Sequence, residues 1–97
     1  ACTAAEARVD GFVSYAPEMA HQGGGFRPEA YEMLAGLEAS NFWFIVRNDI
    51  IEWAFRTYAP VVRSFMEVGC GTGYVLERLV KIYPQAAAIG TEIFVTG

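Results

Sequence analysis

The feature that most constrains the fold is a run of alternate glycines between residues 69 and 73, placed between two different periodic patterns. Residues 64–68 form a short, largely apolar run typical of a buried strand. Residues 72–83 carry apolar side chains at helical spacing, and a proline follows them. Residues 86–94 have the pattern of a second strand. Strand, glycine loop, helix and strand in this order predict one βαβ unit with a parallel pair of strands.

Two helices are expected before this unit. Pro28 suits the first position of one helix, because its missing N–H would be unpaired there. Ser40 or Asn41 can cap the second helix, which a proline ends. The sequence therefore predicts an α/β fold in which N-terminal helices precede one Rossmann-like βαβ unit. Residues 1–27, broken by glycine and proline, are expected to be a loosely ordered segment, and residues 28–97 the folded domain.

The second helix carries a hydrophobic stripe. Trp43, Val46, Ile50 and Trp53 recur at spacings of three and four residues, as on one face of a helix. We interpret this stripe as core packing and not as a cofactor-binding surface. Arg47 lies on the same helix, and its sequence position is compatible both with a surface role and with contact to the carboxylate of a ligand.

Composition excludes several classes of partner. The net charge is −4 and the seven basic residues are scattered, which argues against a surface for nucleic acid. No apolar run approaches the roughly 20 residues that a membrane span needs. Cys2 and Cys70 form no disulfide framework, so we expect a cytoplasmic protein. His21 has no second ligand at metal spacing, and no metal site is predicted.

The glycine loop is typical of a ligand-binding site. Glycines let a ligand approach the main chain, and such loops lie at the carboxyl ends of parallel strands, where ligands bind. A dinucleotide fingerprint requires a third glycine where this chain has Tyr74. Glu67, two residues before Gly69, would repel a pyrophosphate and attract a ligand with ammonium and sulfonium groups. At ~4 Å and an effective dielectric near 20, such a charge pair is worth roughly 4 kcal/mol before desolvation.

Residues 65–73 resemble the first motif of the class I S-adenosylmethionine-dependent methyltransferases, and residues 90–94 resemble the end of their second strand. Residues 41–48 are similar to the helix that precedes the first strand in the ubiquinone-biosynthesis-like, type 11 and 12 subgroup, where this helix closes over the cofactor. The resemblance covers roughly residues 40–97. It implies an incomplete class I methyltransferase sheet, because the family has seven strands and this chain supplies two.

The resemblance also implies S-adenosylmethionine as the cofactor. Glu92, 19 residues after Gly73, takes the place of the acid that binds both ribose hydroxyls in the family. Ile93 and Phe94 would then flank the adenine. The expected cofactor-binding residues are Glu67, Gly69, Cys70, Gly71, Thr72, Gly73, Glu92, Ile93 and Phe94.

These expectations describe the cofactor-binding portion of a methyltransferase that is inactive alone, because nothing in the chain positions a methyl acceptor. Catalytic residues are not assigned. The chain can be a fragment or a naturally short protein. The alternatives are a non-catalytic oligomerising module with a truncated Rossmann-like fold and, less favoured, an NAD(P) binder. A two-stranded parallel sheet has open edges, so we also expect self-association, as a homodimer.

Overall fold

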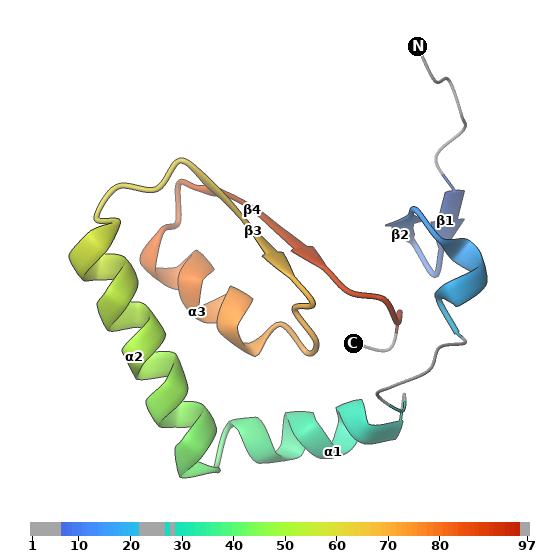
Figure 1. Ribbon diagram of the computed structural model, residues 1–97, viewed down its shortest axis with the longest axis horizontal. Coiled ribbons are helices and arrows are strands. Elements are labelled where there is room, and N and C mark those ends of the chain that lie inside the picture. The colour runs from blue at the N-terminus through green and yellow to red at the C-terminus, as the bar shows by residue number, and fades with distance from the viewer. Residues whose placement is uncertain (1–6, 22–26, 28, 96–97) are drawn as a thin grey trace.

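The computed structural model describes residues 7–21, 27 and 29–95 (Figure 1). Its α/β architecture confirms the predicted fold class. Cys2, the glycines at 23–25 and Pro28 lie outside the described residues. The elements in chain order are β1 (Ala7–Val9), β2 (Phe12–Ser14), the 3-10 helix η1 (Pro17–Met19), α1 (Glu29–Glu38), α2 (Phe42–Tyr58), β3 (Ser64–Val68), α3 (Tyr74–Ile82) and β4 (Ala87–Thr91).

The predicted βαβ unit is formed by β3, α3 and β4. The two strands pair in parallel, with Met66 opposite Ile89. β4 is shorter than the predicted strand because it ends before Glu92, whose side chain accepts a hydrogen bond from the next main-chain amide. α3 begins at Tyr74 and not at Thr72, because the backbone of the preceding glycine is left-handed. The arrows of β3 and β4 point in the same direction, toward the lower right of the view, and α1 lies below them (Figure 1).

The β3–β4 sheet is covered by α3 on one face. A Cβ built on Gly90 would lie 2.8 Å from Leu76 Cδ2 and 2.9 Å from Cys70 Sγ, so this strand approaches α3 and its loop closely. Side chains alternate between the two faces of a strand. On the other face Met66 and Val68 remain exposed, the second of them by 81%. The sheet is thus one-sided within the described part of the chain.

The start of α2 follows a local signal. The Asn41 side chain accepts a hydrogen bond of 2.9 Å from the Trp43 amide, as an N-cap does, and this confirms one of the two predicted caps. At the C-terminal end of α2, the Tyr83 hydroxyl donates to the Ala59 carbonyl oxygen at 2.7 Å. These bonds fix where α2 begins and where its C-terminal end meets the end of α3.

Charged side chains join α2 to α3. Arg78 of α3 donates from Nε to Glu52 Oε2 at 2.5 Å and also pairs with Asp49, both on α2. Arg56, one turn after Glu52, donates to its other oxygen at 2.8 Å. Hydrogen bonds from Arg56 and Arg78 lower the pKa of the Glu52 carboxyl. The two helices are therefore held together by a shared carboxylate at their surface.

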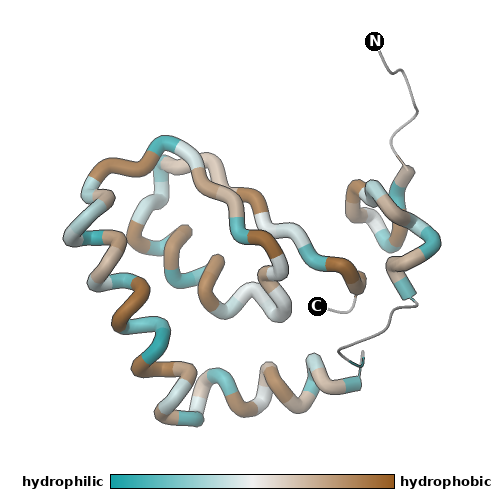
Figure 2. The backbone as a smooth tube through the Cα atoms, viewed as in Figure 1, coloured by the Kyte–Doolittle hydropathy of each residue, from teal (hydrophilic) through white to brown (hydrophobic). Residues whose placement is uncertain are grey.

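The hydrophobic stripe of α2 faces solvent, so its interpretation as core is wrong. Trp43 is 61% exposed and Trp53 58%, and Val46 and Ile50 between them are also exposed. α2 is apolar on two sides, and its other side packs inward with residues such as Ile51. Figure 2 shows hydrophobic segments recurring along the whole of α2. Helical periodicity alone does not tell which of two apolar sides becomes buried.

The molecule is expanded for its length. Its radius of gyration is 15.3 Å, compared with about 13 Å for a compact domain of 100 residues. The buried apolar side chains of the described residues are Ala20, Tyr31, Leu79 and Phe94. A small core and a large exposed apolar surface follow from this shape.

The N-terminal segment contains a hairpin that the sequence analysis did not predict. β1 and β2 pair antiparallel, with Val9 opposite Phe12. Asp10 and Gly11 form the turn between them, and both have positive φ. An Asp-Gly pair between two short apolar runs is a strong hairpin signal, so the turn was readable from the sequence. The Val95 amide donates to the Ala20 carbonyl oxygen at 3.3 Å, which links this segment to the chain after β4.

Replacing Gly90 by alanine tests the close packing of β4 against α3. The new methyl group would overlap Leu76 and Cys70, and we expect a loss of about 1–3 kcal/mol in the free energy of unfolding, measured by urea titration. Gly36→Ala is the matched control, because a Cβ there meets no atom within 4 Å and alanine favours helix by about 1 kcal/mol. Equal effects of the two substitutions would contradict this packing.

Candidate functional site

The site is built around the glycine loop between β3 and α3. Gly69, Gly71 and Gly73 have φ angles of 71°, 55° and 79°, in the left-handed region that side chains disfavour. A Cβ added at Gly69 or Gly73 would meet no atom within 4 Å. Glycine is therefore required there by backbone conformation, and the space beside these two positions is open to a ligand.

The end of β4 holds this loop in place. The Gly69 and Cys70 amides donate to the Thr91 carbonyl oxygen at 2.7 and 2.9 Å. The Gly71 amide donates to Glu92 Oε2 at 2.8 Å, and the other oxygen of Glu92 accepts from the Ile93 amide at 2.7 Å. The acid predicted to bind a ribose thus lies directly against the predicted ligand loop.

The two predicted acids, Glu67 and Glu92, lie beside the same residue. Burial raises the pKa of the Cys70 thiol most, and the negative charges of Glu67 and then Glu92 raise it further. Glu67 and Cys70 line one cavity, and Glu92 accepts a hydrogen bond from Gly71, the residue after Cys70. The structure brings the two acids together at the carboxyl ends of the parallel strands, which is the arrangement that the sequence predicted.

A cavity of about 340 Å³ lies between the glycine loop, α1 and α2. Glu67 lies in its wall, and Oε2 of that carboxylate is buried without a hydrogen-bond partner. Burial raises the pKa of Glu67, while the Arg47 guanidinium and the Leu76 backbone amide act in the opposite direction. The lining residues are Leu34, Glu38, Phe44, Arg47, Ile51, Glu67, Gly69, Cys70, Gly71, Thr72, Tyr74 and Val75.

Four of the predicted site residues lie outside this lining: Gly73, Glu92, Ile93 and Phe94. Glu92 contacts the loop through Gly71, as described above. Ile93 is about half exposed, and Phe94 is only 4% exposed, with its ring packed edge-on against Tyr31 at a centroid distance of 6.3 Å. Phe94 therefore serves as a core residue in this conformation.

Sequence reasoning missed two residues that α1 brings to the site. Burial raises the pKa of Tyr31 most, and the charge and hydrogen bond of Glu92 raise it further. Glu38, which is buried, accepts a hydrogen bond from the Thr72 hydroxyl of the glycine loop. Glu38 and Thr72 lie 34 residues apart, and no local pattern predicts their contact.

A third missed residue, Asn48 of α2, contacts Tyr74 of the cavity lining. It is 2% exposed, and its Nδ2 donates to the Tyr74 carbonyl oxygen at 3.3 Å. Its Oδ1 is buried without a partner. A fully buried amide at this place ties α2 to the first residue of α3.

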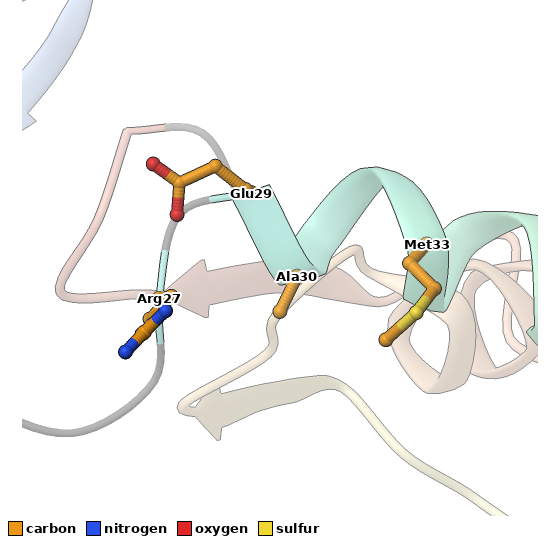
Figure 3. Close-up of a pocket in the computed structure, with 4 residues that line it drawn as sticks. All are labelled: Arg27, Glu29, Ala30 and Met33. Atoms are coloured by element: carbon orange, nitrogen blue, oxygen red, sulfur yellow. The ribbon is translucent and has the colours of Figure 1, made fainter.

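A wider hollow of about 670 Å³ lies at the beginning of α1 (Figure 3). Ala30 and Met33 point to the same side of the helix, whereas Glu29 points away from them. Arg27 completes the lining. The hollow shares no lining residue with the glycine loop, so it is not part of the site described above.

Comparison with known proteins gives one informative match. The chain is 32% identical over 57 residues to the Biotin biosynthesis bifunctional protein BioHC of Teredinibacter turnerae (strain ATCC 39867 / T7901). The match includes 59% of this chain and 9% of that protein, so the chain spans about a tenth of its relative. No family model matches the chain, and no solved structure matches it significantly. Among the described helices, none has the length and apolar character to cross a membrane.

The raised pKa of Glu67 predicts a pH-dependent effect on stability. The folded chain binds this proton more tightly than the unfolded chain, so ionising the carboxyl costs stability as pH rises. We expect Glu67→Gln to become progressively more stable than wild type as pH increases from about 4.3, the ordinary carboxyl pKa, to neutrality. Urea titrations across this range measure the difference.

Glu18→Gln, at an exposed position of η1, serves as the control and should show no such trend. Parallel stability curves of Glu67→Gln and wild type over the same pH range would contradict the burial of this charge.

Proposed function

We propose that this chain supplies the S-adenosylmethionine-binding part of a class I methyltransferase. The main support for this proposal is an open, left-handed glycine loop at the carboxyl ends of parallel strands. Two carboxylates, Glu67 and Glu92, flank this loop. The negative charge of Glu67 beside the loop suits a cationic nucleoside and opposes a pyrophosphate. An acid at the position of Glu92 is compatible with both cofactors, so Glu67 and the bulky Tyr74 favour S-adenosylmethionine over NAD(P).

The residues present fit this cofactor. The buried, unpaired Oε2 of Glu67 supplies a negative acceptor for an ammonium group. Each oxygen of Glu92 accepts one main-chain hydrogen bond, and Tyr31 also bonds to this carboxylate. A carboxylate has about four acceptor positions, so one is left that can accept from a ribose hydroxyl. When bound, the cofactor supplies an electrophilic methyl group. The chain's own residues would bind and orient the nucleoside.

The comparisons support the same class. The match to BioHC is to a protein that contains a methyltransferase, and it covers more than half of this chain. The free thiol of Cys70 suits a reducing cytoplasm, where we place the protein.

Calorimetry with S-adenosylhomocysteine and, separately, with NAD tests the proposed class. We expect the first ligand to bind and the second not to bind. Binding of NAD alone would overturn the proposal in favour of a dinucleotide binder, and binding of neither ligand would favour a purely structural module.

Glu92→Ala tests the ribose contact. Loss of hydrogen bonds to a charged group is worth roughly 1–3 kcal/mol, so the dissociation constant of S-adenosylhomocysteine should rise by roughly 5- to 150-fold. Glu77→Ala, at an exposed position of α3, is the control and should bind as wild type does. An unchanged affinity of Glu92→Ala would remove Glu92 from the site.

A second candidate function is self-association, as a homodimer. The observation that favours it is the exposed apolar surface on α2 and on the free face of the sheet, which includes Trp43, Trp53 and Val68. Light scattering should show a dimer at micromolar concentration, and dilution should make the two tryptophans more accessible to a fluorescence quencher. A monomer with quenching independent of concentration would contradict this candidate.

A further inference from the structure

The outer side of α2 has the residue spacing with which two helices pack side by side. Four apolar residues follow one another there at steps of three, four and three, and we call them the α2 seam: Trp43, Val46, Ile50 and Trp53. This alternation of steps is the pattern of a coiled coil. The four side chains are exposed, from 47% for Val46 to 61% for Trp43. The described part of the chain thus leaves a regular packing surface uncovered.

The opposite side of α2 is occupied by contacts within the chain. Asn48 is 2% exposed and bonds to the Tyr74 carbonyl oxygen, and the Phe55 ring lies 6.2 Å from the Tyr83 ring. Asn48 and Phe55 project from the helix on the side away from the α2 seam. These contacts fix α2 without using the seam, so a partner meets a helix that is already in place and pays little ordering cost.

Two opposite charges lie along one edge of the α2 seam. Asp49 and Arg56 are seven residues apart, about two helical turns, so they project on the same side. Each side chain is 58% exposed. Asp49 pairs with Arg78 through Oδ1, and Arg56 pairs with Glu52 through Nε. A carboxylate and a guanidinium can each make further hydrogen bonds, so both side chains can also pair with a charge on a partner.

These charges fit a second copy of α2 that runs in the opposite direction. Contacts across a two-fold axis are reciprocal, so Asp49 of each copy would face the partner's Arg56, which gives two ion pairs. In a parallel pair of helices, Asp49 would instead face the partner's Ala54, which carries no charge. The antiparallel arrangement also places the opposite ends of the two helix dipoles side by side. The sequence of α2 is therefore complementary to itself in one orientation.

We propose that α2 is the interface of a homodimer, in which the α2 seams of two copies pack antiparallel. Trp43 and Trp53 supply most of the contact area, as large aromatic side chains do at the centre of interfaces. α2 has 17 residues and is about 25 Å long, so the contact is small and we expect a dissociation constant in the micromolar range. This inference rests on the self-association proposed above, and it is independent of the cofactor.

Sedimentation of the whole chain tests which surface forms the dimer. Trp53→Glu should be monomeric at concentrations where wild type is a dimer, because it buries two charges at the contact. Met66→Glu is the matched control: it adds the same charge on the free face of the sheet, where the side chain is 60% exposed, and it should dimerise as wild type does. Circular dichroism establishes that both variants are folded.

The opposite result, a monomeric Met66→Glu and a dimeric Trp53→Glu, would assign the dimer to the sheet face and overturn the proposed role of α2. A wild-type chain that stays monomeric over the micromolar range would contradict self-association by any surface.

An exchange of charges tests the antiparallel arrangement. Arg56→Glu alone, or Asp49→Lys alone, would place two pairs of like charges across the interface. Each should weaken the dimer by roughly 5- to 30-fold at low ionic strength. An equimolar mixture of the two variants should dimerise about as tightly as wild type, because opposite charges then meet at both contacts. Lys81→Glu on α3 is the control, since it changes the net charge as Arg56→Glu does and should dimerise as wild type does.

The mixture separates the interface from effects within each chain. A substitution that acted only by disturbing its own contact with Arg78 or Glu52 would remain as weak in the mixture as alone. A mixture that is no tighter than the separate variants would therefore show that the antiparallel arrangement is wrong. Neither result bears on the nucleoside site, which calorimetry tests separately.

Discussion

The site depends on the hydrogen bonds between the glycine loop and the residues at the end of β4. One carbonyl oxygen, that of Thr91, accepts from two consecutive loop amides, and the Glu92 carboxylate accepts from the third. A loop with three left-handed residues has little intrinsic preference for one shape, so these bonds decide its shape. The same loop leads into α3, which begins directly after the left-handed Gly73. Fold and ligand chemistry are therefore specified by the same few atoms.

The parts of the fold that were predictable from the sequence are those with local signals. Alternate glycines after an apolar run identified the βαβ unit, and the Asn41 cap identified the start of α2. The loop residues and the two acids also came together as expected, because the carboxyl ends of parallel strands share one edge. The Asp10-Gly11 turn is also a local signal for a hairpin. It was missed because glycine and proline are frequent in the surrounding segment and indicated a loosely ordered chain.

The rest depends on contacts between distant residues. Tyr31 and Glu38 of α1 reach Phe94 and Thr72, and no spacing in the sequence indicates these contacts. The orientation of α2 was equally unpredictable. With apolar residues on two sides, its rotation is decided by polar side chains: the buried Asn48 and the carboxylates that meet Arg78. Asn48, Asp49 and Glu52 contact α3, whereas Trp43 and Trp53 are exposed.

The contacts of Arg78 with Asp49 and Glu52 have a consequence for the cavity. They are partly exposed to water, so dissolved ions weaken them more than they weaken the buried contacts of the loop. The same helix that these ion pairs fasten carries Arg47 in the cavity wall. Ionic strength thus acts on the position of that wall through the outer surface of the molecule, while the glycine loop, fixed by main-chain amides, keeps its shape.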